Sequence, residues 1–142
     1  MPFSSADLTC PSLPADLCAQ ILAEAGDAII YTDRQGIIRF WNRGAHVIFG
    51  YPAAEALGRS LDLIIPERWR ERHWQGFRRV MAAGATRYGD QLLAAPGLRK
   101  DGQLLSLEFS LILVRDHLGA VAGAAAILRD VTARWQKEKD RG

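Results

Sequence analysis

The chain has 142 residues, of which 49% are hydrophobic, and its formal net charge at pH 7 is +2. This length predicts one domain with a genuine core, and so small a net charge gives no general reason to expect direct binding to nucleic acid. No apolar run approaches the length of a membrane span, and the first residues show no secretory signal pattern, so we expect a cytoplasmic protein. Two cysteines, Cys10 and Cys18, are too few for a disulfide framework or a zinc site.

The N-terminal segment predicts an arm followed by a helix. Residues 1–12 contain Ser, Thr and Pro without a hydrophobic period, which is typical of a flexible arm, whereas residues 13–26 have helical character. The apolar residues of this helix are Leu17, Ile21 and Leu22. They either cover the domain's own sheet or form a dimer contact, and the sequence favours neither alternative.

A hairpin and four helices are expected next. The β-rich runs 29–32 and 37–41 are joined by the turn sequence DRQG, which predicts a hairpin. Residues 42–66 alternate short apolar pieces with Gly and Pro, which predicts three helices of two turns or less. A longer helix over 67–83 should end at Gly84.

The last third of the chain has the period of strands. Residues 104–114 alternate apolar and polar side chains, which predicts a half-buried antiparallel strand. Residues 87–95 and 120–130 are expected to form the strands before and after it, through the turn sequences RKDG and RDHLG. A charged helix over 132–139 follows. The sequence therefore predicts an α+β domain with five strands.

One histidine lies on the apolar side of the long helix. At helical spacing the sequence PERWRERHWQGFRRVM places on one stripe Trp69, His73, Gly76, Phe77 and Val80. A neutral imidazole is the commonest protein ligand of haem iron and has to lie on an inward-facing apolar wall for this role, and His73 meets both conditions. The ordinary interpretation of such a histidine is a core or boundary residue, and that of the surrounding arginines is a solvated helix face.

The element order and three segments resemble the PAS family of sensor domains. The segments are TDRQGIIRFWNRGAHVIFGY, LRKDGQLLSLEFSL and ILRDVTAR. The resemblance implies a five-stranded antiparallel sheet, with short helices and one longer helix on one face and a flanking helix at each end. It divides the chain into a flexible arm (1–12), an N-terminal flanking helix (13–26), the PAS core (27–131) and a C-terminal exit helix (132–142).

Residues 60–102 are similar to haem-binding PAS sensors of oxygen and, especially, to the carbon-monoxide-responsive PAS regulators. In those proteins a histidine at the position of His73 is the proximal iron ligand, so the resemblance implies haem b as cofactor and a diatomic gas as ligand. Arg72 and Arg79 on one flank of the helix, and Arg70 on the other, are placed to meet the haem propionates.

The rest of the expected haem pocket comes from the helix and the strands. Trp69 and Phe77 are expected beside the ligand. The opposite wall is expected from the inward strand positions Leu93, Phe109, Leu111, Ala124 and Ala126. The two alanines would leave room for a flat ring against the sheet.

The sixth coordination position departs from the family pattern. Oxygen-sensing PAS domains carry an arginine donor on the strand after the long helix, and counting forward from His73 this place is held by Leu93. The carbon-monoxide-responsive group supplies a sulfur ligand from the distal strands, but the only methionines here are Met1 and Met81. We therefore expect five-coordinate ferrous iron that favours carbon monoxide or nitric oxide over oxygen.

Four residues leave that expectation open. The flexible arm would have to deliver Cys10 or Cys18 to provide a sulfur ligand. Tyr88 and Gln91 are expected on the neighbouring strand, where either side chain would supply a hydrogen-bond donor for oxygen.

Other functions also stay open. Trp41 and Asn42 resemble residues of flavin sites, so a redox flavin is one alternative, although the cysteine motif of photoactive flavin domains is absent. A PAS domain without cofactor that serves dimerisation or docking is the other. No nucleophile with an adjacent base and no phosphate loop appears, so an enzyme is not expected. We expect a homodimer through the N-terminal helix and an output partner that the sequence does not identify.

Overall fold

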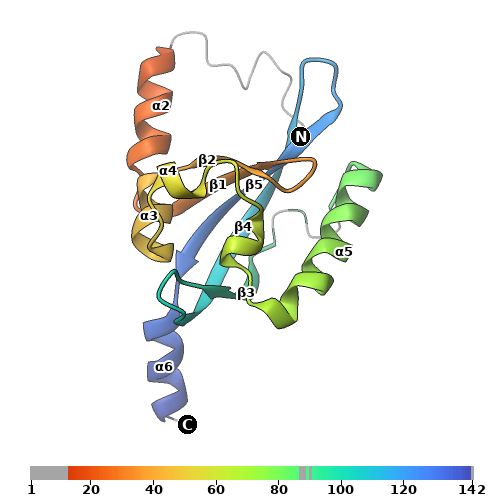
Figure 1. Cartoon of the computed structure of the whole chain (residues 1–142). Helices are drawn as coiled ribbons and strands as arrows, with labels where there is room; N and C mark the ends of the chain where they lie inside the picture. The colour runs from red at the N-terminus through yellow and green to blue at the C-terminus, as the bar shows by residue number, and fades with distance from the viewer. Residues whose placement is uncertain (1–12, 87–88, 90, 142) are drawn as a thin grey trace.

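The chain folds into a five-stranded antiparallel sheet with helices packed on one face (Figure 1). The computed structural model describes residues 13–86, 89 and 91–141, so the expected arm and Tyr88 lie outside the described residues. The elements in chain order are α2 (Ala15–Glu24), β1 (Ala28–Asp33), β2 (Ile38–Trp41), α3 (Arg43–Phe49), α4 (Ala53–Ala56), the 3-10 helix η1 (Leu61–Ile64), α5 (Glu67–Ala83), β3 (Leu93–Leu98), β4 (Leu104–Arg115), β5 (Val121–Asp130) and α6 (Thr132–Arg141). The predicted α+β fold class is confirmed. Among the described residues, no helix is long and apolar enough to cross a membrane.

The order of the strands in the sheet is β2-β1-β5-β4-β3. The strand that comes last in the chain, β5, therefore lies in the middle, between β1 and β4. Residues paired across antiparallel strands point to the same face of a sheet. Two rows cross the inner face: Trp41, Ile30, Ala126 and Leu111 form one, and Ala28, Leu128, Phe109 and Leu93 form the other.

The short helices cover one part of the inner face tightly. The core that they form with the strands includes Ala28, Ile30, Ile38, Leu105, Leu107 and Leu128 from the sheet, and Ala45, Phe49, Ala56 and Ile64 from the helices. Phe49 is fully buried, and its ring centroid lies 5.7 Å from that of Trp41. Burial of one such side chain stabilises the fold by about 2 kcal/mol, so this part of the domain holds α3, α4 and η1 in place.

Strand β3 lies further along the chain than the sequence predicts. The expected strand over 87–95 is wrong in its position, because the structure places β3 at Leu93–Leu98, across Pro96 and Gly97. β3 is an edge strand, where a proline is tolerated because only one side needs hydrogen bonds. A Cβ at Gly97 would come within 2.5 Å of Leu107 Cδ1 and 3.4 Å of Phe49 Cε1, so glycine makes room for the core at this point.

Helix α2 projects from the domain with its apolar side uncovered (Figure 1). The exposed fractions of Leu17, Ile21 and Leu22 are 39%, 60% and 44%. These side chains do not cover the domain's own sheet, so that alternative is wrong. The dimer contact through this helix stays a prediction.

Asn42 joins α2, β1 and α3. Its side-chain oxygen accepts hydrogen bonds from the backbone N–H of Ile29 at 2.8 Å and of Ala45 at 3.0 Å, and the second of these caps α3. Its amide nitrogen donates to the carbonyl of Leu22 at 2.9 Å and of Asp27 at 3.0 Å. Because Asn42 is only 4% exposed, water cannot replace these partners.

We predict that Asn42→Ala lowers the free energy of unfolding by about 3 kcal/mol, because the helix cap is lost and buried backbone groups are left without partners. Urea denaturation measures the change. Ser60→Ala is the matched control, since Ser60 Oγ caps η1 by accepting a single bond from Asp62 N at 3.2 Å. It should cost less than about 1 kcal/mol. Equal losses in the two variants would contradict the role assigned to Asn42.

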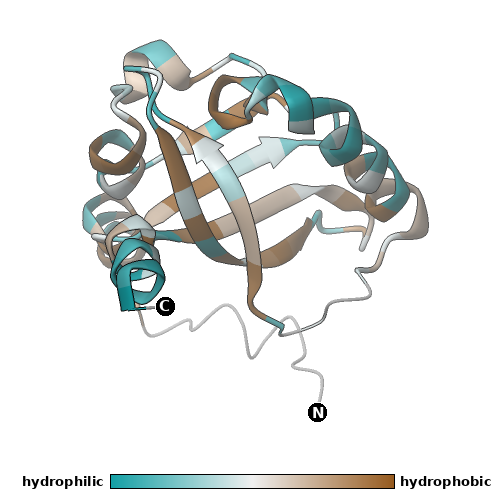
Figure 2. Ribbon diagram, turned by 90° about the horizontal axis from the view of Figure 1, so that it is seen from below, coloured by the Kyte–Doolittle hydropathy of each residue, from teal (hydrophilic) through white to brown (hydrophobic). Residues whose placement is uncertain are grey.

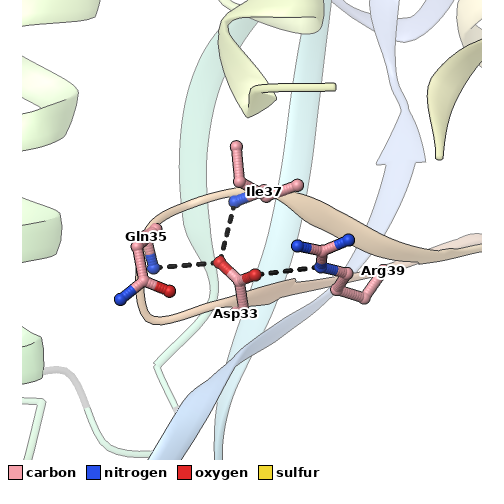
Figure 3. Close-up of polar contacts among 4 residues, drawn as sticks. All are labelled: Asp33, Gln35, Ile37 and Arg39. Atoms are coloured by element: carbon pink, nitrogen blue, oxygen red, sulfur yellow. Dashed lines mark hydrogen bonds and ion pairs between the residues drawn. The ribbon is translucent and has the colours of Figure 1, made fainter. Parts of the chain in front are cut away.

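The predicted hairpin turn DRQG joins β1 to β2 and is organised by Asp33 (Figure 3). One carboxylate oxygen accepts the backbone N–H of Gln35 at 2.9 Å and of Ile37 at 3.1 Å, and the other accepts Arg39 Nε at 2.9 Å. Gly36 has a φ of +77°, which a glycine adopts at little cost. Partial desolvation raises the pKa of Asp33, but the hydrogen bonds from Ile37, Arg39 and Gln35 and the charge of Arg39 together lower it.

This lowered pKa predicts a pH dependence of stability. The unfolded chain binds a proton at Asp33 more readily than the folded protein, so the stabilisation is present above about pH 4 and is lost as the pH falls through the folded-state pKa. The difference in free energy of unfolding between the wild type and Asp33→Asn, measured by urea denaturation, should shrink on acidification. In Arg39→Ala part of the dependence should remain, because the backbone donors are still present. A difference that does not change with pH would refute this prediction.

Candidate functional site

Helix α5 carries the histidine singled out by the sequence. It begins after Pro66 and ends at Gly84, whose φ is +68° and whose N–H donates to the carbonyl of Val80. The predicted bounds of this helix are confirmed. In Figure 2 the long helix is mostly hydrophilic in colour, whereas the strands beside it are mainly white to brown, so most residues of α5 are polar.

The protein-facing side of α5 is broader than the predicted stripe. The members of the predicted stripe, Trp69, His73, Gly76, Phe77 and Val80, are all half-buried. The buried residue of the helix is Met81, and Trp74 is also half-buried. The predicted stripe leaves out Met81 and Trp74, because the helix is rotated about its axis so that both side chains face the rest of the protein. Met81 stands four residues after Phe77, so an apolar i, i+4 pair was present as a signal.

His73 is packed against aromatic rings and has no hydrogen-bond partner for one nitrogen. Its ring centroid lies 4.6 Å from that of Trp74, edge-on, and 6.1 Å from that of Phe77, stacked. Its Nδ1 is buried and meets no hydrogen-bonding atom among the described residues. Burial lowers the pKa of His73, and the carboxylate of Asp62 opposes this by raising it. The imidazole is therefore held in its neutral form, the form that binds metals.

Two of the three arginines expected at haem propionates point to solvent. Arg72 and Arg79 are exposed, and the guanidinium of Arg72 lies 5.5 Å from the ring centroid of Trp69. Arg70 is half-buried, and its Nε donates to the carbonyl of Ile65 at 3.0 Å. Within the described residues, none of these arginines forms an ion pair with a carboxylate.

The strand register brings the predicted sheet residues together. Leu93 pairs directly with Phe109, and Leu111 pairs directly with Ala126, so all four point to the inner face. Ala124 shares that face, because it pairs with Thr32, which lies on the same side of β1 as Ile30. Phe109 and Ala126 pack against the same core cluster as Trp69 of α5. The strand residues and the apolar side of α5 therefore belong to one region of the domain.

This region is less completely covered than the rest of the inner face. Leu105, Leu107 and Leu128 under the short helices are buried, whereas the predicted wall residues Leu93, Phe109, Leu111, Ala124 and Ala126 are half-buried. The facing side chains of α5 are half-buried as well. Apolar surface thus remains accessible on both sides, which suits an additional apolar group.

Two surface depressions are found among the described residues, and the smaller of them lies on the outer face of the sheet, away from this region. One, of about 600 Å³, is lined by Pro66, Glu67, Arg68, Leu98 and Leu104, where α5 begins beside the β3–β4 hairpin. The other, of about 240 Å³, is lined by Asp27, Leu92, Glu108, Ser110, Ile127 and Arg129. His73 lines neither of them, so space for a porphyrin would have to open between α5 and the strands.

The remaining predicted candidates do not join this region. Trp41 is buried and its Nε1 donates to the carbonyl of Tyr51 at 2.8 Å, and the polar atoms of Asn42 form hydrogen bonds within the fold. Cys18 is exposed on α2, and Gln91 is exposed before β3. Among the described residues, no group of three or more His, Cys, Asp or Glu side chains could hold a metal ion.

We predict that His73→Phe leaves the haem-free protein as stable as the wild type or stabilises it by up to about 1 kcal/mol, because it removes a buried nitrogen that has no partner. Phe77→Ala is the control from the same aromatic cluster, and loss of its half-buried ring should cost about 2 kcal/mol. Urea denaturation measures both. A destabilised His73→Phe variant would show that the imidazole has a structural partner.

The chain is similar to known proteins over most of its length. A sequence profile of the PAS fold matches residues 22–136. An uncharacterized protein of Azorhizobium caulinodans is 34% identical over 110 residues, which cover 76% of this chain and 15% of that protein. The sensor protein FixL of Bradyrhizobium diazoefficiens is 26% identical over 118 residues, which cover 83% of this chain and 23% of that protein. The chain thus spans less than a quarter of the length of either relative.

A solved structure agrees with the profile. The crystal structure of the PAS domain of a protein from Colwellia psychrerythraea is 25% identical, with a TM-score of 0.73, and the likeness covers 84% of this chain and 98% of that one. The agreement extends over nearly the whole of that domain.

Proposed function

Because this chain belongs to the PAS family, we propose that it is a sensor module that binds haem b through His73 and responds to a diatomic gas, with carbon monoxide or nitric oxide favoured over oxygen. PAS domains are typically sensory modules rather than enzymes, and the chain is 26% identical over 118 residues to the sensor protein FixL. The single observation that supports the haem ligand is the buried imidazole nitrogen without a partner on the protein-facing side of α5.

An unpartnered buried nitrogen is costly. Leaving a polar group without a hydrogen bond in a protein interior costs about 1–3 kcal/mol. Metal binding would offset this cost, since a metal would occupy one ring nitrogen of His73 and fix the tautomer of the other. The neutral form favoured by burial of His73 is the ligand form.

Other residues of the chain would hold the porphyrin by its faces and its edge. Trp69 and Phe77 from α5, and the strand wall of Leu93, Phe109, Leu111 and Ala126, would contact the apolar ring. The charged propionates would stay at the solvent edge, where Arg72 and Arg79 are exposed and form no ion pair with a described carboxylate. Haem iron, when bound, supplies the coordination position for the gas.

The preference among gases follows from the strand wall. Leu93 and its partner Phe109 offer no hydrogen-bond donor, and Gln91 is exposed outside β3. Bound oxygen requires such a donor more than carbon monoxide or nitric oxide does. The buried Met81 is on the same helix as His73, so it does not supply a distal sulfur ligand.

We expect the protein produced with a haem supply to show a Soret band that shifts under carbon monoxide after reduction. His73→Ala should abolish the band because the iron loses its protein ligand. His46→Ala and His117→Ala are the controls, since both histidines are exposed and lie outside α5. Absorption spectra of the oxidised, reduced and carbon-monoxide forms measure this. A wild type that takes up no haem would refute the proposal.

A docking module is the second candidate, and one observation favours it. The exposed apolar residues Leu17, Ile21 and Leu22 on α2 offer a surface for a second copy of the chain or for an output partner. A colourless protein that forms dimers through α2 would establish this function in place of haem sensing.

A further inference from the structure

Trp74 lies directly beside His73 and contacts two other segments, η1 through Asp62 and the β1–β2 turn through Gly36. Its indole Nε1 donates a hydrogen bond of 2.6 Å to Oδ1 of Asp62 in η1. The indole is half-buried, and its ring meets Phe77 edge-on, with 5.2 Å between the ring centroids. A short bond to a carboxylate at one edge of the ring restricts its rotation.

The opposite edge of the indole rests on the β1–β2 turn. A Cβ added at Gly36 would overlap the Cη2 and Cζ3 atoms of Trp74, so only glycine leaves space for the ring. The turn is itself held by the bonds of Asp33 and by Arg34, whose guanidinium donates to the carbonyls of Val121 at 2.8 Å and Met81 at 3.4 Å. The indole is therefore clamped between η1 and a well-ordered turn.

The imidazole of His73 lies against this clamped ring. Its buried Nδ1 has no hydrogen bond among the described residues, so no polar contact of that atom sets the plane of the imidazole. Two aromatic rings contact the imidazole, that of Trp74 edge-on and that of Phe77 stacked, and the carboxylate of Asp62 acts on it electrostatically. The nearer of these two, at 4.6 Å between centroids, is Trp74.

We propose that Trp74, held by Asp62 and seated on Gly36, is the positioning residue that orients the His73 imidazole. The inference rests on the proposed function for its purpose, since an iron ligand must present one nitrogen in a defined direction. The positioning itself is a property of the protein without haem and is tested there.

The test uses two substitutions of Asp62. Asp62→Ala removes the acceptor of the indole bond, whereas Asp62→Asn keeps an acceptor oxygen and removes the charge. The NMR signal of the His73 Cε1–H group, assigned with His73→Ala, is recorded in haem-free protein at about pH 9, where imidazole is neutral. The wild-type signal should be displaced from that of free histidine by the ring currents of Trp74 and Phe77. Asp62→Ala should move it most of the way back and broaden it, and Asp62→Asn should leave it in place.

Two glycine variants test the other side of the clamp. Gly36→Ala should displace the His73 signal as Asp62→Ala does. Gly58→Ala is the matched control, because Gly58 has a similar φ of +84° but nothing within 4 Å of an added Cβ. It introduces the same kind of backbone strain without touching Trp74, so it should leave the signal unchanged.

The outcomes separate the positioning role from haem binding. A His73 signal that stays at the wild-type position in both Asp62→Ala and Gly36→Ala overturns the inference. In haem-loaded protein, the iron–histidine stretching band should broaden in Asp62→Ala and stay as in the wild type in Asp62→Asn. If no variant, the wild type included, takes up haem, the proposed function fails, while the imidazole signal still decides the positioning role.

Discussion

Antiparallel pairing of β1, β5 and β4 creates one broad apolar face, and that face has to be covered by helices. The chain covers it unequally. The short helices α3, α4 and η1 bury Leu105, Leu107 and Leu128, and the side chain of Asn42 joins α3 to β1 and α2. The rest of the face is left to α5 and to strand residues that remain half-buried. The tightly packed part contributes most of the buried apolar area, and the loosely packed part keeps apolar surface accessible.

Helix α5 contains a buried polar atom that lowers the stability of the domain, Nδ1 of His73. A domain of this size is stable by only about 5–15 kcal/mol, so a buried nitrogen without a partner uses a noticeable share of that stability. Such a cost is typical of functional sites, where binding requires a group that packing alone would not select. The imidazole of His73 packs against the rings of Trp74 and Phe77, its Nδ1 has no hydrogen-bond partner among the described residues, and burial lowers its pKa.

The β1–β2 turn connects this histidine to the centre of the sheet. Gly36 touches the indole of Trp74, and Arg34 binds carbonyl groups of both α5 and β5. β5 in turn leads directly into α6, which projects from the opposite end of the domain to α2 (Figure 1). A change in the position of α5 would therefore be felt at a turn that also contacts the strand before the exit helix. The turn thus links α5 to the start of β5 at Val121, and the other end of β5 leads into α6.

Much of this protein was determined by local sequence. Pro66 and Gly84 set the bounds of α5, the alternation of residues 104–114 gave β4 its apolar face, and the spacing around His73 placed it on the protein-facing side. The tertiary structure alone decided the rest. β3 runs through Pro96 because the order of strands makes it an edge, and Trp74 and Met81 join the covered side because α5 is rotated about its axis by contacts with η1 and the hairpin turn. Periodicity reports which residues share a face of a helix or strand, but the rotation of that face and the identity of its neighbours depend on segments distant in the chain.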